Sequence, residues 1–201
     1  MDRKQKILRL AGRLGIIRPR DVEAEGIPRE YLYRLCTSGH LVRIGRGLYA
    51  LPDALRSEAI TLAEVAKLVP NAVVCLLSAL QFHDLTTQVP HQVRIAVENR
   101  RWEPKFDYPP IELVRLTGRA FSFGLEEHET DRVPVKVYSP AKAVADCYKF
   151  RNRIGLDVAL EALRRTWRSR KARMDELWEA AKVCRVANVM RPCLEAITFP
   201  S

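Results

Sequence analysis

The feature that most constrains this chain is the way glycine and proline divide its first fifty residues into short segments. From Ile7 to Leu14 apolar side chains recur at helical spacing, and Gly15 follows as a stop signal, which predicts a first helix. A second short segment begins near Pro19 and ends at Gly26. Such punctuation favours a small unit built from short helices.

The next residues predict a third helix and a β-hairpin. Pro28 stands where a first helical residue is favoured, and Gly39 stands where a left-handed cap ends a helix. The apolar stripe between them consists of Tyr31, Leu32, Leu35 and Cys36. Two strand-like runs, 41–44 and 48–51, flank the turn Gly45-Arg46-Gly47. Helix, short helix, helix and hairpin in this order are the layout of a winged helix-turn-helix.

The outer face of the third helix carries groups that suit DNA. Projected at about 100° per residue, the helix turns its polar side chains away from the apolar stripe. With the cations of the hairpin, the candidate DNA-binding residues are Arg29, Tyr33, Arg34, Thr37, Arg43 and Arg46. Such groups can contact base edges in the major groove and phosphates beside it. Glu30 is the one residue of this face whose negative charge does not suit DNA. In the alternative interpretation the unit docks a protein, with Tyr33 and Tyr49 holding the partner.

The charge distribution agrees with a polyanionic partner. The 201 residues carry a formal net charge of +10, of which residues 1–50 hold +6, residues 51–150 hold −1 and residues 151–201 hold +5. Basic residues concentrated in a small unit attract phosphates, because bound Lys and Arg release counterions. The alternative explanation is that these cations only solvate helix faces, so charge alone does not decide.

The remaining residues predict a second, α+β domain. We expect a winged helix-turn-helix domain at 1–53 and, after a short linker, an α+β domain of about 145 residues at 57–201. The apolar run 73–80 predicts either a buried helix or a junction from strand to helix. Further strands are expected at 91–97, 111–116 and 133–137, and the chain turns helical after Pro140. The predicted fold class is α+β, with a mixed α/β domain that ends in several helices.

Sequence patterns for catalysis are weak, and we expect no enzyme. Ser139-Pro140-Ala141-Lys142 matches Ser-x-x-Lys, but its companion motifs are absent, and Ser139 as a helix N-cap is the simpler explanation. Glu103-Pro104-Lys105, with Asp84 upstream, resembles a metal-dependent nuclease motif, although a proline inside the required strand argues against it. A nuclease delivered by the winged helix stays the enzymatic alternative, with Glu103 and Asp146 as its test positions.

Composition argues against metal, cofactor and membrane. The five cysteines contain no Cys-x-x-Cys, so free thiols are expected and a zinc site is not. No glycine-rich phosphate loop occurs, and the histidines lack ligand spacing, so we expect no metal and no cofactor. The longest nearly unbroken apolar run, Ala72 to Leu80, is far shorter than the roughly 20 residues that a bilayer crossing needs. The expected location is the cytoplasm.

Two further basic stretches leave their roles open. The cluster Arg164–Arg173 either binds phosphate or forms the solvated face of a helical hairpin, and the second interpretation is favoured. The loop Asn99–Pro110 interleaves cations with Trp102, Phe106 and Tyr108. Such a pattern suits single-stranded nucleic acid and suits anchoring on a core equally well.

Several strings together resemble a known family. They include Gly26-Ile27-Pro28-Arg29, Gly39-His40-Leu41-Val42-Arg43-Ile44-Gly45-Arg46-Gly47-Leu48-Tyr49, Cys75-Leu76-Leu77-Ser78-Ala79-Leu80, Tyr138-Ser139-Pro140-Ala141-Lys142 and Gly155-Leu156-Asp157. In combination they are similar to AbiEi-type antitoxins of the type IV toxin–antitoxin, or abortive infection, systems. The similarity covers nearly the whole chain.

The resemblance implies a function and partners. Such antitoxins repress their own operon by binding inverted repeats in double-stranded promoter DNA through the winged helix. Their C-terminal domain counters a nucleotidyltransferase-like toxin, and a direct contact with that toxin is not assumed. A monomer or weak dimer on the inverted repeats is therefore expected.

Overall fold

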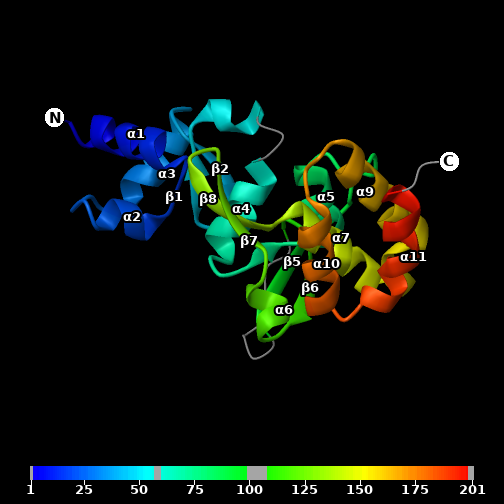
Figure 1. Ribbon diagram of the computed structural model, residues 1–201. Helices are drawn as coiled ribbons and strands as arrows, with labels where there is room; N and C mark the ends of the chain where they lie inside the picture. Colours follow the sequence, from blue (N-terminus) through cyan, green and yellow to red (C-terminus); the bar gives the residue numbers. More distant parts are fainter. Residues whose placement is uncertain (1, 57–59, 99–107, 199–201) are drawn as a thin grey trace. The chain divides into compact units, whose positions relative to one another are not determined.

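The computed structural model describes residues 2–56, 60–98 and 108–198 and has an α+β fold (Figure 1). The described residues form two compact units. The first is drawn from 2–56, 60–70, 108–109 and 128–135, and the second from 71–98, 110–127 and 136–198. The predicted fold class is confirmed: an N-terminal helical region is followed by a mixed sheet and C-terminal helices. Among the described residues, no helix is both long enough and apolar enough to span a bilayer.

The first fifty residues form the predicted helices and hairpin, plus one short strand. The elements are α1 Arg3–Leu14, β1 Ile16–Ile17, α2 Pro19–Glu23, α3 Glu30–Thr37, β2 Val42–Gly45 and β3 Leu48–Ala50. The three strands form an antiparallel sheet in the order β1-β3-β2. Helix α3 begins later than predicted, because Pro28 belongs to the preceding turn, in which its carbonyl oxygen accepts a hydrogen bond from the Tyr31 amide at 3.2 Å.

The apolar stripes of the three helices meet in one core. This core consists of Ile7, Leu10, Ala11, Ile17, Val22, Ile27, Leu32, Leu35 and Leu41. Its members come from every segment that glycine and proline separate in the sequence. Burying apolar side chains from α1, α2 and α3 together stabilises helices that are too short to persist alone.

A second apolar cluster extends the first unit beyond the hairpin. The chain continues through the 3-10 helix η1 Pro52–Arg56 and helix α4 Ile60–Leu68. Ala63 of α4 packs with Ile16, Leu48 and Val133, and all four side chains are buried. The Nη1 of Arg18 also donates a hydrogen bond to the carbonyl oxygen of Lys67 at 3.3 Å. Residues of α4 and of the 128–135 segment are thus part of the core of this unit.

The second sheet is mixed and has five strands in the order β6-β5-β4-β8-β7. Its strands are β4 Val73–Val74, β5 Val93–Glu98, β6 Ile111–Leu116, β7 Leu125–Thr130 and β8 Val133–Tyr138. Strand β4 pairs antiparallel with β5 and parallel with β8, with Val74 opposite Val137. Strands β5 and β6 pair in parallel over six residues. The predicted strands at 91–97, 111–116 and 133–137 are confirmed.

Seven helices accompany this sheet in the described part of the chain. They are α5 Leu76–Phe82, α6 Arg119–Ser122, α7 Pro140–Lys149, α8 Arg151–Ile154, α9 Leu156–Arg168, α10 Met174–Val183 and α11 Ala187–Thr198. Helix α7 is their centre, because α5, α9, α10 and α11 all contact it and its residues 141–148 are all buried (Figure 1). The run 73–80 is a junction from strand β4 to helix α5, which was one of its two predicted forms.

Candidate nucleic-acid interface

Helix α3 presents the predicted side chains to solvent. Its apolar stripe is fixed in the core by Leu32 and Leu35, which are 1% and 5% exposed. Because successive residues turn around the helix, the side chains between the stripe positions point outward. Tyr33 is 75% exposed although it is a large aromatic residue, and Arg34 and Thr37 are also exposed. Solvent reaches Arg29, the N-cap residue of α3, in the same way.

Two arginine side chains lie over the ring of Tyr31 at the edge of α3. The guanidinium carbons of Arg34 and Arg3 lie 5.3 Å and 5.5 Å from the centre of the Tyr31 ring. The Nη1 of Arg3 also donates a hydrogen bond to the Tyr31 hydroxyl at 2.9 Å. An exposed cation over an aromatic ring is stabilised by about 0.5–1 kcal/mol, enough to favour one position of each side chain. Arg3 is a candidate site residue that the sequence did not indicate, since a pattern along one helix does not show which side chains of another face it.

Local contacts define what the remaining α3 groups can offer a ligand. The Thr37 hydroxyl donates to the carbonyl oxygen of Tyr33 at 3.1 Å, so its oxygen and its methyl group stay available. Arg29 lies 4.0 Å from the carboxylate of Glu30, and both side chains are mostly exposed. A pair this exposed contributes little stability, so an incoming phosphate can displace it.

The hairpin carries two more exposed cations. Arg43 lies on β2, and its Nε donates to the carbonyl oxygen of Gly45 at 3.2 Å. Arg46 stands at the turn between β2 and β3, and in the described part of the chain it has no acidic partner. The pairing of β2 with β3 shifts register between Arg43 and Gly45. The predicted residues thus divide into four on or beside α3 and two on the hairpin.

A buried carboxyl group lies against the hairpin. Glu64 of α4 is 4% exposed, and a Cβ atom at Gly45 would collide with its Oε1. Within the described residues that oxygen has no hydrogen-bond partner. Burial raises the pKa of Glu64 to about 7, because the carboxylate loses its water shell without gaining a compensating charge. The absence of a side chain at Gly45 is what lets β2 pass over this carboxyl group.

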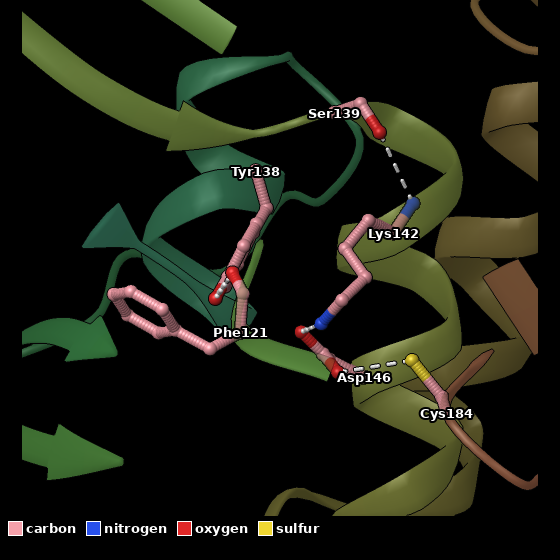
Figure 2. A network of polar contacts seen from close by, with 6 residues as sticks. All are labelled: Phe121, Tyr138, Ser139, Lys142, Asp146 and Cys184. Atoms are coloured by element: carbon pink, nitrogen blue, oxygen red, sulfur yellow. Dashed lines mark hydrogen bonds and ion pairs between the residues drawn. The ribbon is translucent and has the colours of Figure 1, made fainter. Parts of the chain in front are cut away.

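A separate polar network lies buried in the second unit (Figure 2). Lys142 and Asp146 form an ion pair one turn apart on α7, and both are at most 1% exposed. The Cys184 thiol donates to Asp146 Oδ1 at 3.3 Å, and the Tyr138 hydroxyl donates to the carbonyl oxygen of Phe121 at 2.7 Å. The Nζ of Lys142 also lies 4.1 Å from the centre of the Tyr138 ring. In this network the charges of Lys142 and Asp146 compensate each other, and the thiol and phenol groups beside them each have a hydrogen-bond acceptor.

The contacts of this network argue against Ser139 and Lys142 as a catalytic Ser-x-x-Lys pair. The Ser139 oxygen accepts a hydrogen bond from the backbone amide of Lys142 at 3.4 Å, which confirms Ser139 as the N-cap of α7. The Lys142 ammonium instead faces Asp146, so it is not placed to activate Ser139 (Figure 2). Burial, with the charge of Asp146 added, raises the pKa of the Cys184 thiol to about 12, which keeps it protonated.

Of the residues that the nuclease alternative would use, Asp84 and Asp146 lie within the described part of the chain. Asp146 is used in the buried pair, while Asp84 is 89% exposed and lies 3.4 Å from Lys171. Glu103 and Lys105 lie outside the described residues, as does most of the Asn99–Pro110 loop. Tyr108 of that loop is 63% exposed. The five cysteines are free thiols, as the sequence predicted.

The first unit thus combines short helices around one core, a three-stranded sheet and an exposed cationic face. Comparison with protein families finds a match to this part of the chain. Residues 5–52 match the family described as "Transcriptional regulator, AbiEi antitoxin", so the N-terminal region is similar to that of AbiEi-type antitoxins. The match covers the segment that carries α1 to β3, and it supports a general role as regulator and antitoxin. A comparison with curated protein sequences finds no match.

Proposed function

We propose that this chain is a DNA-binding repressor of its own operon and the antitoxin of a type IV toxin–antitoxin system. Residues 1–53 act as a winged helix-turn-helix, and α3 is its recognition helix. The observation that carries the proposal is the exposed face of α3, where a 75% exposed tyrosine stands beside arginines. An exposed aromatic ring can pack against a ligand, and the arginines beside it favour a polyanion.

The proposed contacts follow from the chemistry of each side chain. Arg34 reads a guanine edge in the major groove through its two-pronged guanidinium group, and Tyr33 packs beside it. Thr37 offers its methyl group to a thymine, because its hydroxyl hydrogen is held by the Tyr33 carbonyl group. Arg29, at the start of α3, reaches the major groove beside them, so the outer face of α3 lies against the bases.

The hairpin supplies the second set of contacts. Arg46 at the turn and Arg43 on β2 bind the flanking phosphates or enter the minor groove, as the wing does in this type of domain. The protein binds as a monomer or a weak dimer on inverted repeats in the promoter. Its functional partner is a nucleotidyltransferase-like toxin, which the second domain counters without a required direct contact. The chain itself performs no catalysis.

Titration of the upstream promoter DNA with variant proteins tests these roles. We expect Arg34→Ala to weaken binding by about 1–3 kcal/mol at one position of the site, because a base contact is lost. Arg46→Ala removes one phosphate contact, so the slope of log K against log salt should become shallower by about 0.9.

The matched control is Arg119→Ala, which removes the same charge from the second unit. Arg119 is 71% exposed like the candidate arginines, but it is held by Glu179 at 2.8 Å. This variant should bind DNA like the unaltered protein. If Arg34→Ala and Arg46→Ala also bind like the unaltered protein, the face assigned to DNA is wrong.

A further inference from the structure

A hollow between α9 and α11 combines an aromatic side chain with cations. Arg164, Trp167 and Arg168 of α9 line one side, and Ala196 and Ile197 of α11 line the other. Its volume of about 390 Å³ falls in the range of pockets that hold small molecules. All five residues belong to the second unit, so the hollow is separate from the face proposed for DNA.

The two arginines of this pocket have no acidic partner among the described residues. Arg164 and Arg168 are four residues apart and therefore lie on one face of α9. Both are exposed, and neither forms an ion pair with an acidic side chain among the described residues. Arg165, which stands between them in the sequence, instead pairs with Glu161 at 2.8 Å. Among the described residues that line the pocket there is no carboxylate to compete for its cations.

The structure separates this pair from the rest of the basic cluster Arg164–Arg173. Arg173 lies 2.8 Å from Asp175, and Lys171 donates to the carbonyl oxygen of His83. The sequence favoured a solvated helix face for the whole cluster. That interpretation fits the paired members, whereas Arg164 and Arg168 flank a hollow and have no ion-pair partner among the residues that the structure describes.

The third element of the pocket is a flat apolar surface. Trp167 is half-buried on α9 between the two arginines, and the small side chain of Ala196 and the aliphatic side chain of Ile197 come from the neighbouring helix. Indole rings stack on planar bases, and guanidinium groups form paired hydrogen bonds with phosphate oxygens. A ligand that satisfies both surfaces has a planar aromatic base and a phosphate group.

We infer that this pocket binds a nucleoside phosphate, with the base against Trp167 and the phosphates on Arg164 and Arg168. The same chemistry is offered by a free mononucleotide and by the phosphorylated end of a single strand. Two other hollows differ in their lining. Among the described residues, the one beside α1 contains Lys6, Arg9, Arg13 and Glu25 without an aromatic side chain, and the one at the start of α7 sets three glutamates beside Phe123 and Lys171.

Calorimetric titration of the full chain with ATP and GTP tests the pocket. We expect a dissociation constant of about 1 mM or lower for at least one of them. Trp167→Ala should weaken binding about 5- to 150-fold, which is the range found when a stacked base loses its aromatic partner. Arg164→Ala and Arg168→Ala should each weaken it about 10-fold or more, because each removes a charge-assisted contact with phosphate.

Two matched controls separate the pocket from general effects. Arg165→Ala removes the same charge one residue away, and Trp178→Ala removes an indole from α10 that lies under Arg191. Both should leave nucleotide affinity unchanged. Trp167→Phe keeps an aromatic ring and should recover most of the affinity that Trp167→Ala loses, which a mere loss of packing would not explain.

Titration with inorganic tripolyphosphate and with a 5′-phosphorylated hexathymidine strand completes the test. Tripolyphosphate should bind at least 5-fold more weakly than ATP, because it cannot stack. Tighter binding of the strand than of the mononucleotides assigns the source to a strand end, and the reverse assigns it to free nucleotide. The inference is overturned if neither binds near 1 mM, if tripolyphosphate equals ATP, or if Arg165→Ala weakens binding as much as Arg164→Ala does.

Discussion

At the scale of single residues, the least expected feature is Glu64. A glutamate in the helical run that begins at Ile60 has the sequence signature of a solvated position, yet its side chain is buried beneath the hairpin. The close approach of Gly45 explains this, because a strand without a side chain leaves room for a carboxyl group. The energetic consequence depends on pH, since a buried carboxyl group is tolerated when protonated and costly when ionised.

Replacing Glu64 with Gln should remove a pH dependence of stability. The folded pKa of about 7 lies above the ordinary value of 4.5, so the unfolded chain releases this proton at lower pH than the folded one does. The contribution of Glu64 is therefore retained below about pH 4.5, is lost as pH rises through about 7, and then levels off.

Urea unfolding at about pH 5 and about pH 8 measures this effect. We expect Glu64→Gln to match the unaltered protein near pH 5 and to exceed its free energy of unfolding by about 1–3 kcal/mol near pH 8. Glu30→Gln is the control, since its side chain is 66% exposed and should give no such difference. A Glu64→Gln variant that is no more stable at the higher pH would contradict the burial of an ionisable group here.

The buried pair on α7 gives a second prediction at this scale. Lys142→Met leaves Asp146 buried without its counter-charge, which should destabilise the fold by about 3–5 kcal/mol. Lys149→Met removes a lysine from the same helix at an exposed position and should change stability by less than about 0.5 kcal/mol. Urea unfolding of both variants measures the difference. Equal, small effects of the two substitutions would mean that the ion pair is not buried.

At the scale of elements, the sequence predicted what local pattern controls. The helix that ends before Gly15, the hairpin around Gly45-Arg46-Gly47 and the Ser139 cap all depend on residues close in the chain, and all three are present. Strand β1 was missed because two residues are too few to show alternation. Strand β7 was missed because its less exposed positions, Glu126, His128 and Thr130, are polar, so the strand has no alternation of apolar and polar residues.

The candidate site residues also fall into two groups, those that a local pattern predicts and those that depend on packing between helices. Helical periodicity predicted the exposure of Tyr33 and Arg34, because Leu32 and Leu35 fix which side of α3 faces the core. Arg3 and the Arg164–Trp167–Arg168 pocket could not be found that way, since both depend on which helix lies beside which. Contacts between distant segments depend on how the helices pack, and the periodicity within one segment does not predict that packing.

The end of α1 gives a prediction at the element scale. Gly15 has a φ of +66°, and a Cβ atom there would collide with the carbonyl oxygen of Asp131 in the 128–135 segment. Gly15→Ala should therefore destabilise the first unit by about 2–3 kcal/mol, through backbone strain and the collision together. Gly12→Ala is the matched control within α1, because no atom lies near its Cβ position.

Gly12→Ala should have the opposite sign and stabilise α1 by about 0.5–1 kcal/mol, since alanine is the better helix former. Thermal unfolding followed by circular dichroism compares the two variants. Stabilisation by Gly15→Ala would contradict the contact between the end of α1 and residue Asp131.

At the scale of the whole molecule, the cations behind the net charge of +10 fall into two sets with different proposed ligands. The N-terminal cations face outward from α3 and the hairpin, where a duplex can meet them. In the C-terminal segment, three of the six cations of the basic cluster are paired, and two line a pocket. We therefore propose two different anion-binding sites in this basic chain. The arginines of one site can be substituted without changing the residues of the other.

The most direct test of the central claim is the binding of the unaltered protein to a labelled fragment of its own upstream DNA, measured over a series of salt concentrations. We expect log K to fall linearly with log salt, by about 0.9 for each phosphate neutralised, and a scrambled fragment to bind about a thousand-fold more weakly or worse. Equal affinity for the two fragments, or no binding at the lowest salt, would contradict a DNA-reading function for α3.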